Sequence, residues 1–330
     1  MSKDILIVPD LGQDASSPVV CELVTLARRL ALASQGRVGV LVLGAVPLEP
    51  AAWAARGVDC VYFATGDPDA LLPETRLATV ADAARRASTA IVLLPHAVSG
   101  AELAPRLAFR LDGAVATGCI DVSIEAGTVH CTRPCYGGLA RECDELAATP
   151  VVATVRAGVF ERSPQQAGRR AESIDLGPFD PQAARMKRVD RRLEAAAGTR
   201  LEDAAVIVAG GRGLEGPEGF ELLAELAHEL GGAVGASRVP CDLGWCPHSW
   251  QIGLTGKTVT PELYFAVGIS GAGHHMAGCG NARTIVAINS DPEAPIFQDA
   301  RFGVTGDYRE VVPALIGQLR ALSDASSGKP

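Results

Sequence analysis

The chain has 330 residues, of which 48% are hydrophobic, 21% are charged and only 5% are aromatic. This length suits one large or two ordinary domains with buried cores, and the aliphatic, glycine-rich composition favours α/β layers over a β-sandwich. Thirty basic residues against thirty-eight acidic ones give a formal net charge of −8, which argues against a general affinity for nucleic acid.

Nine cysteines are scattered along the chain. The closest pairs are Cys131/Cys135 and Cys241/Cys246, and none forms Cys-x-x-Cys. This irregular spacing argues against a disulfide framework or a zinc ribbon and favours reduced thiols in the cytoplasm. Residues 5–8 are too few for the apolar part of a signal peptide, and no stretch offers about 18 continuous apolar residues. We therefore expect a cytoplasmic protein without a membrane span.

The first half alternates between strand and helix patterns. We expect strands at residues 5–9, 38–43, 60–63 and 90–94, and helices at 19–32, 75–86 and 100–111. Beyond Gly113 the pattern changes to short strands at 119–124, 128–134 and 151–155. This predicts a parallel nucleotide-fold (Rossmann-like) sheet extended by an antiparallel or mixed portion. Because no glycine-rich phosphate loop follows the first strand, we assign this half to scaffold and partner contact.

Charge replaces the apolar pattern near the middle of the chain. Residues 186–194 read Met-Lys-Arg-Val-Asp-Arg-Arg-Leu-Glu, which could be a basic docking strip, an edge strand or a solvated connector. We interpret them as a linker between an N-terminal α/β domain, residues 1–185, and a C-terminal parallel-sheet domain, residues 195–330.

The second domain begins with a strand at 206–211 and a helix at 218–230. The turn between them combines three closely spaced glycines with Arg212, so it could bind a phosphate or could be glycine-rich for steric reasons. The next strand, 233–236, ends in Ser237 and Arg238, an arginine that could also be a surface ion-pair partner. Residues 251–257 could be an ordinary turn, but Gly253 and Gly256 would also let Thr255 approach a flat ring.

The most informative pattern is the strand at 263–267, which runs into Gly-Ile-Ser-Gly-Ala-Gly. Small residues let backbone amides approach a ligand, and a helix beginning there would turn its free N–H groups toward a diphosphate. This favours a dinucleotide-like cofactor. Two further strand ends carry Asn289 and Asp307, which could bind a ribose or be turn residues, and residues 310–322 read as a closing amphipathic helix.

His274 and His275 do not predict a metal site. Adjacent helical side chains point about 100° apart, and Cys279 is the only further ligand at the right spacing, so we expect no metal. Ser270 differs by one position from a Gly-x-Ser-x-Gly elbow, which makes a hydrolase the least favoured interpretation.

The same segments carry a family resemblance. The FAD-binding half of electron transfer flavoprotein α subunits resembles five segments of this chain, at residues 210–217, 235–238, 244–248, 261–278 and 287–297. The N-terminal half of the same subunits resembles three segments, at residues 103–108, 133–138 and 152–160. The resemblance implies one FAD in the domain from about 195 to 330. The residues assigned to the cofactor are Arg212, Ser237, Arg238, Gln251, Ile252, Gly253, Leu254, Thr255, Gly256, Ser270, Gly271, Ala272, Gly273, His274, His275, Asn289 and Asp307.

Individual roles follow from the resemblance alone. It implies that Arg238 lies beside the isoalloxazine ring with Ser237 donating a hydrogen bond, and that Thr255 lies near N5. It further implies that Gln251 lies near the pyrimidine end and that His275 reaches the O2/N1 edge as a donor or cation. The chain departs from the family at Leu254 and His274, where glutamine is usual, and at Gly273, where a bulkier aliphatic residue is usual.

The resemblance also implies a function, that of an electron carrier rather than a substrate-converting enzyme. Such a carrier pairs with a separately encoded β subunit, which would hold any AMP. It takes electrons from flavin dehydrogenases such as the acyl-CoA dehydrogenases of fatty acid β-oxidation, and passes them to a quinone-linked oxidoreductase. Two alternatives stay open: a bifurcating relative with NADH as donor and a second FAD in β, and a non-redox nucleotide-binding scaffold.

Overall fold

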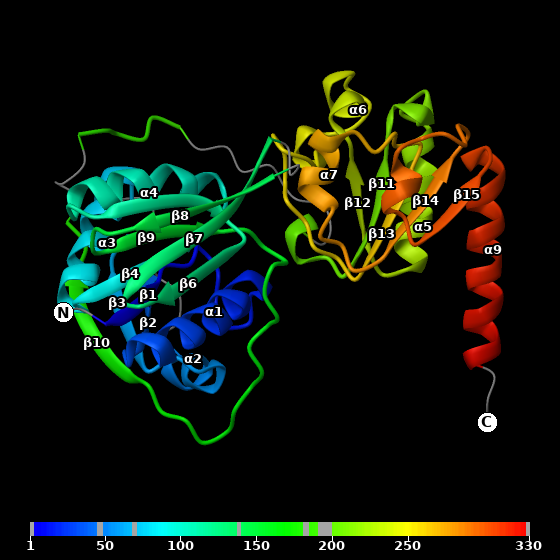
Figure 1. Ribbon diagram of the computed structural model, residues 1–330. Coiled ribbons are helices and arrows are strands. Elements are labelled where there is room, and N and C mark those ends of the chain that lie inside the picture. Colours follow the sequence, from blue (N-terminus) through cyan, green and yellow to red (C-terminus); the bar gives the residue numbers. More distant parts are fainter. Residues whose placement is uncertain are drawn as a thin grey trace. The chain divides into compact units, whose positions relative to one another are not determined.

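The computed structural model describes residues 3–44, 49–67, 71–136, 140–180, 185–190 and 200–327, with the backbone alone for 323–327. The chain divides into two compact units, Met1–Leu193 and Glu194–Pro330 (Figure 1). Of the expected linker, residues 186–190 have neither helix nor strand, whereas 191–194 and the expected start of the second domain at 195 lie outside the described residues.

The first unit is built on a parallel sheet with the strand order β10-β3-β2-β1-β4-β9-β5. Its members are β1 (Asp4–Ile7), β2 (Val38–Leu43), β3 (Cys60–Thr65), β4 (Thr89–Pro95), β5 (Ala114–Cys119), β9 (Val151–Val155) and β10 (Glu172–Pro178). Every pairing in this sheet is parallel. The Rossmann-like expectation for this half is therefore confirmed.

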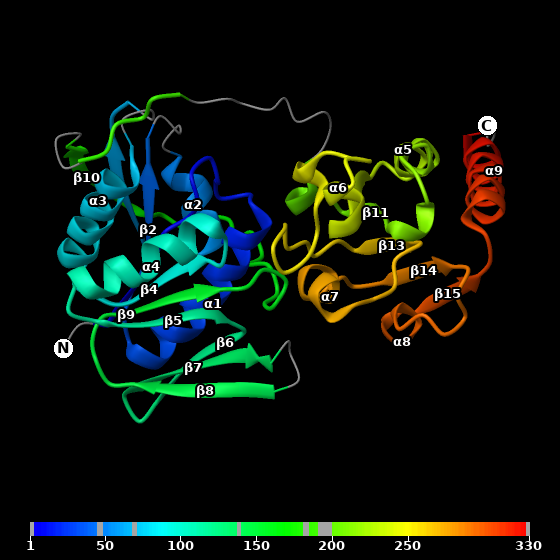
Figure 2. The same ribbon diagram turned by 90° about the horizontal axis from the view of Figure 1, so that it is seen from above.

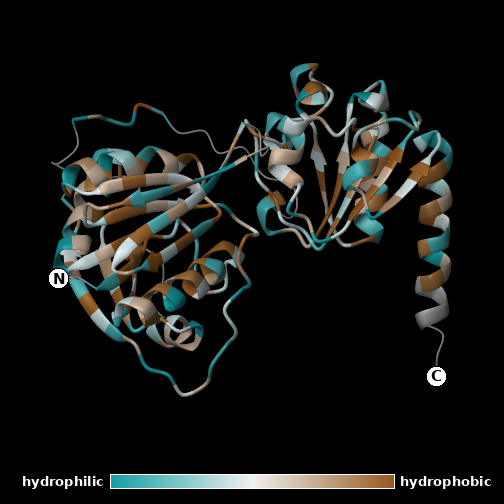
Figure 3. Ribbon diagram, viewed as in Figure 1, coloured by the Kyte–Doolittle hydropathy of each residue, from teal (hydrophilic) through white to brown (hydrophobic). Residues whose placement is uncertain are grey.

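Helices cover both faces of that sheet, namely α1 (Pro18–Ser34), α2 (Pro50–Arg56), α3 (Pro73–Arg86) and α4 (Val98–Arg110). Side chains alternate along each strand, so Ile5 and Ile7 pack with α1 and α2, whereas Leu6 and Val8 pack with α3 and α4. Figure 3 shows the resulting apolar strands between more polar helix surfaces.

A small antiparallel sheet with the order β6-β7-β8 accompanies the parallel one. Its strands are β6 (Asp121–Glu125), β7 (Thr128–Cys135) and β8 (Ala140–Leu146). Two expectations were wrong in detail. The single strand expected at 119–124 is divided, because β5 ends at Cys119 in the parallel sheet and β6 begins at Asp121. The run at 151–155 is a fully buried strand of the parallel sheet rather than of the antiparallel portion.

The second unit is a doubly wound parallel sheet with the order β12-β11-β13-β14-β15. The strands are β11 (Val206–Gly210), β12 (Ala233–Ala236), β13 (Leu263–Val267), β14 (Ile285–Asn289) and β15 (Phe302–Thr305). The helices are α5 (Gly219–Glu229), α6 (Arg238–Asp242), α7 (Gly273–Cys279), α8 (Ile296–Asp299) and α9 (Tyr308–Ser327), with single 3-10 turns at Leu201–Asp203, Arg212–Leu214 and His248–Trp250.

Helices lie on both faces of this second sheet as well (Figure 2). One face packs against α5 and α9, and the other packs against α7 and α8. The chain runs from β11 to β12 on one side and then crosses to β13 on the other. In sheets of this kind ligands bind beyond the carboxyl ends of the strands, where the winding direction changes. Here that place lies between β11 and β13.

Candidate functional site

The loops after β11 and β13 are joined at the carboxyl edge of the second sheet. The backbone N–H of Gly211 donates to the carbonyl of Val267 at 2.9 Å, and that of Gly213 donates to Gly268 at 3.0 Å. A Cβ atom on Gly211 would lie 2.1 Å from the Gly268 carbonyl oxygen, so only glycine permits this approach. The glycines of the Arg212 turn therefore have a steric role, one of the two interpretations that the sequence left open.

The loop between β13 and α7 presents a row of unpaired amides. The backbone N–H groups of residues 270–274 donate no hydrogen bond within the described part of the chain. Gly271 has φ +85°, and a Cβ there would lie 2.4 Å from the backbone nitrogen of Ile296. The loop thus folds tightly against the start of α8 while leaving donors free. This fits the expectation of an anionic, diphosphate-bearing ligand.

A cavity of about 220 Å³ lies beside this loop. It is lined by Arg238, Gln251, Ile252, Gly253, Leu254, Thr255, His274 and His275. Sites for whole drug-sized ligands span about 300–1,000 Å³, so this cavity suits one flat ring system of a larger molecule. The structure thus brings together these eight of the residues assigned to the cofactor. It places Arg212, Ser237, Gly256, Ser270, Gly271, Ala272, Gly273, Asn289 and Asp307 in or beside the loops after the strands, outside this cavity.

Backbone hydrogen bonds hold the loop that forms one wall of the cavity. Ile252 N–H donates to the Ala236 carbonyl at 2.8 Å, which fixes the loop to the end of β12. Gln251 Nε2 donates to Thr255 Oγ1 at 2.9 Å, so the threonine hydroxyl keeps its own proton for a ligand acceptor. Lys257 pairs instead with Glu202 at 3.1 Å, the surface role that the sequence also allowed.

Arg238 and Arg212, the two arginines assigned to the cofactor, differ in whether a carboxylate pairs with them. Arg238 begins α6 and pairs through Nε with Asp242 at 3.0 Å, although its side chain remains 66% exposed. Arg212 is exposed and has no carboxylate partner among the described residues. A phosphate would therefore meet an uncompensated guanidinium at Arg212, whereas a ligand at Arg238 would share that cation with Asp242.

His275 is buried, and both of its ring nitrogens already have partners. Because a carbonyl can only accept, Nδ1 donates to Ile252 O at 3.0 Å, which leaves Nε2 to accept the hydroxyl of Tyr264 at 2.9 Å. Burial lowers the pKa of His275 from its ordinary value of 6.5 to about 4. The imidazole is therefore neutral at pH 7. This differs from the expected cation or donor at a flavin edge, because the core has already used both nitrogens. His274, the next residue, is exposed.

The side chains of Asn289 and Asp307 are engaged locally. Asn289 Nδ2 donates to Ile269 O at 2.9 Å, and its Oδ1 accepts the N–H of Asp291 at 3.0 Å. Asp307 Oδ1 accepts the N–H of Arg309 at 2.9 Å in the first turn of α9. These contacts correspond to the turn-residue interpretation, and contacts of either residue with a ribose stay a prediction.

Tyr264 has a role at this site that sequence reasoning missed. Its hydroxyl reaches His275 from the middle of a buried strand. A signal was present, since a tyrosine inside a fully apolar strand needs a hydrogen-bond partner for its hydroxyl.

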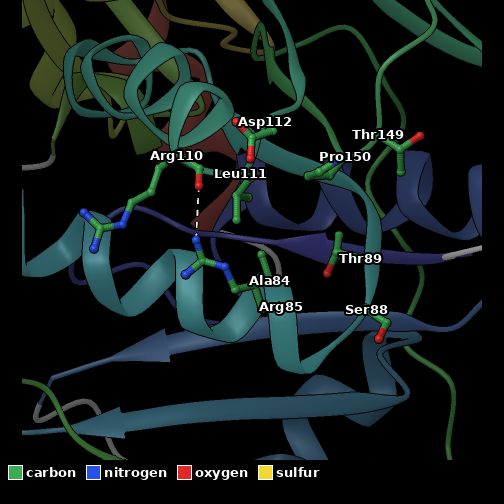
Figure 4. A pocket seen from close by; sticks show the side chains of 9 residues that line it. All are labelled: Ala84, Arg85, Ser88, Thr89, Arg110, Leu111, Asp112, Thr149 and Pro150. Carbon is green, nitrogen blue, oxygen red and sulfur yellow. Dashed lines mark hydrogen bonds between the residues drawn. The ribbon is translucent and has the colours of Figure 1, made fainter.

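A larger cavity, of about 580 Å³, lies in the first unit at the ends of α3 and α4 (Figure 4). Arg85 donates to the carbonyl oxygen of Arg110 there at 3.1 Å. Both arginines stand in the last turn of their helix, where a cation offsets the negative helix end, so their position has a structural explanation. None of the residues assigned to the cofactor lines this cavity.

Within the described ranges, no cluster of three or more His, Cys, Asp or Glu side chains could hold a metal ion. No helix in the same ranges is both long and apolar enough to cross a bilayer.

Comparison with known proteins agrees with the geometry. Residues 5–178 match the family model described as electron transfer flavoprotein domain, and residues 200–280 match electron transfer flavoprotein FAD-binding domain. The chain is 44% identical to electron transfer flavoprotein subunit alpha of Bacillus subtilis, over 70% of this chain and 71% of the relative. It is 36% identical to the protein of the same name from Thermoanaerobacterium thermosaccharolyticum, over 97% and 98%. The corresponding protein of Mycobacterium leprae is also 36% identical, over 96% and 98%.

Proposed function

Because the chain belongs to the electron transfer flavoprotein α-subunit family and binds FAD, we propose that it accepts electrons from flavin dehydrogenases and passes them to a quinone-linked oxidoreductase. The acyl-CoA dehydrogenases of fatty acid β-oxidation are the proposed donors. The proposal makes the chain a carrier, with the redox chemistry supplied by the bound flavin and the binding and electrostatics supplied by the protein.

One observation carries the proposal: a cavity sized for a ring system lies next to free backbone amides at the edge where the sheet changes its winding direction. In this proposal the amides of residues 270–274 and the guanidinium of Arg212 bind the diphosphate. The isoalloxazine ring enters the cavity between Arg238 and the loop that carries Thr255. The unpaired Thr255 proton is donated to a ring acceptor, while Arg238 favours added negative charge on the ring.

His275 has a supporting role in this arrangement. Its hydrogen bond to Ile252 O joins α7 to the opposite wall of the cavity, so it fixes the spacing between the two walls. Because it is neutral, Arg238 is the cation that this proposal places beside the ring. Asn289 and Asp307 are proposed to bind the ribose through the acceptor positions that their local hydrogen bonds leave free.

A β subunit is part of the proposal. The relatives are named as α subunits, and the first unit is a Rossmann-like domain to which we assign no cofactor, so its surface is available for a partner. The segment 186–194 would join that unit to a movable FAD domain. The nine cysteines, all within the described residues, are free thiols, which supports the cytoplasm as the proposed compartment.

An electron-transfer assay tests the donor and the acceptor. The chain is produced with its β subunit, and reduction of its flavin is followed after mixing with an acyl-CoA dehydrogenase and substrate, then after adding a quinone-linked oxidoreductase. The proposal expects reduction in the first step and reoxidation in the second. Reduction by NADH alone, together with a second flavin in the β subunit, would instead support the bifurcating alternative. Failure of both donors would contradict the proposed carrier role.

A further inference from the structure

Two thiols of the second unit lie in direct contact. Cys241 Sγ and Cys246 Sγ are 3.5 Å apart, and both residues are buried, with exposed fractions of 2% and 8%. Cys241 belongs to α6, three residues after Arg238, and Cys246 follows the turn that ends this helix. The proposed carrier function uses neither thiol.

The backbone of the turn brings the two sulfur atoms together. After α6 the chain reverses at Gly244, which has φ +72°. Trp245 N–H donates to Pro240 O at 2.9 Å, and Gly244 N–H donates to Cys241 O at 3.0 Å. This pair of bonds is the Schellman motif that commonly ends helices, and it requires a left-handed residue at the position of Gly244. The contact between the thiols is therefore held by main-chain geometry rather than by chance side-chain orientation.

The environment makes the two sulfurs chemically unequal. A hydrogen bond from Cys246 lowers the pKa of Cys241, and the same interaction together with burial raises the pKa of Cys246. The thiolate is the reactive form in thiol–disulfide exchange, and the proposal below gives the first attack to Cys241, which directly precedes the exposed turn. Asp242, Leu243 and Gly244, at the tip of the turn, are exposed, so a local opening of this five-residue helix would admit a small oxidant.

We propose that Cys241 and Cys246 form a reversible intrachain disulfide, with a low-molecular-weight disulfide such as glutathione disulfide as oxidant. The Cys241 thiolate attacks one glutathione sulfur, which breaks the glutathione S–S bond and releases one glutathione thiolate. The Cys246 thiolate then attacks the Cys241 sulfur of this mixed disulfide and releases the second glutathione. The two protons of the cysteine thiols end on two glutathione thiols, and the two cysteines lose the two electrons that glutathione disulfide gains.

The modification would act on a part of the molecule next to the cavity. The crosslink joins α6 to the segment after the turn, and Arg238 is the first residue of α6 and lines the cavity. Oxidation would therefore restrain the helix that carries this cation. The disulfide itself does not depend on FAD binding, so its formation and the proposed carrier function can fail separately.

The experiment uses the full chain in complex with its β subunit. The complex is incubated with glutathione disulfide, quenched in acid, alkylated in denaturant and mapped by mass spectrometry. Apart from any glutathione adduct on an exposed thiol, Cys241 and Cys246 should become protected together, in one peptide that carries both residues and loses two hydrogens, and dithiothreitol should restore both. Cys246→Ser should abolish this crosslink and leave Cys241 either alkylated or linked to glutathione.

Cys143→Ser is the matched control, because Cys143 is an exposed cysteine on β8 in the other unit. This variant should form the Cys241–Cys246 disulfide at the wild-type rate. The proposal is overturned if, in the wild-type complex, both thiols remain fully alkylated at a glutathione disulfide concentration that already modifies Cys143. It is equally overturned if Cys241 becomes linked to a cysteine other than Cys246.

Discussion

Tyr264 donates its hydroxyl proton to Nε2 of His275 across 2.9 Å, inside the core of the FAD-binding unit. Through His275 Nδ1 the same contact reaches the backbone of Ile252, so one imidazole joins β13, α7 and the loop that walls the cavity. The cavity is therefore shaped by a hydrogen-bond chain anchored in the sheet. This relationship predicts where the site is sensitive to substitution.

Tyr264→Phe should destabilise the second unit. The substitution keeps the ring in the core but leaves Nε2 of a buried histidine without a donor, which costs about 1–3 kcal/mol. Urea unfolding followed by circular dichroism measures this loss. Tyr136→Phe is the control, because the Tyr136 side chain is 82% exposed. This variant should unfold at the same urea concentration as the wild type. Equal stability of the wild type and Tyr264→Phe would show that the hydroxyl contact contributes nothing.

Acid should weaken the protein through His275. The folded-state pKa is about 4 against 6.5 for the ordinary group, so between these values the unfolded chain binds more protons. Stability from this group is therefore complete above pH 6.5 and lost as the pH falls toward 4. The difference of about 2.5 units corresponds to about 3 kcal/mol. Unfolding free energies measured between pH 4 and 7 test this slope.

Two variants separate His275 from the other titrating groups. His275→Gln should remove the part of the pH slope that His275 contributes. His274→Gln changes the exposed neighbour and should keep the full slope. If both variants show the wild-type slope, His275 does not titrate as its burial requires.

Alanine substitutions at Gly271 and Gly273, in the loop after β13, should have opposite effects on stability. Gly271→Ala places a Cβ 2.4 Å from Ile296 N at φ +85°, and should cost at least about 2 kcal/mol and reduce FAD retention. Gly273→Ala meets no atom within 4 Å at the start of α7, and should raise stability by up to about 1 kcal/mol. Thermal unfolding and flavin content after gel filtration measure both effects. Identical behaviour of the two variants would contradict the close packing of Gly271.

The positive charge of Arg238 should raise the midpoint potential of the flavin, and the negative charge of its partner Asp242 should lower it. Arg238→Gln removes a cation from the cavity wall and should lower the midpoint potential, while Arg238→Lys should restore only part of it because the planar fork is lost. Asp242→Asn removes the carboxylate that pairs with Arg238 at 3.0 Å and should raise the potential. Spectroelectrochemical titration measures all three. A shift of the same sign in Arg238→Gln and Asp242→Asn would contradict this account.

Much of the architecture could be predicted because its apolar strands are short, continuous and followed by small residues. The strands at Val38–Leu43, Val151–Val155 and Ala233–Ala236 have the bounds that the sequence pattern predicts. The polar strands β8 and β10 were missed, since their side chains are mostly exposed and pairing alone defines them. The helix Pro50–Arg56 was missed because it is too short for a clear helical period.

At the site, the sequence could predict which segments meet but not how their side chains are used. Parallel strands place their carboxyl ends at one edge, which predicts a ligand beyond the loop after β13, and the family resemblance added the loop at 251–255 and the His274–His275 pair to the same site. Whether a nitrogen of His275 faces a ligand or the core depends on Tyr264 and on the Ile252 carbonyl, which are distant in sequence. Tertiary hydrogen bonds of this kind leave no local pattern.

The most direct test of the account is the flavin content of the purified chain in complex with its β subunit, measured by absorption and by cofactor release, with Gly271→Ala and Gly273→Ala in parallel. The account predicts one FAD assigned to this chain, retained by Gly273→Ala and depleted in Gly271→Ala. A colourless wild-type complex that cannot be reconstituted with added FAD would contradict it.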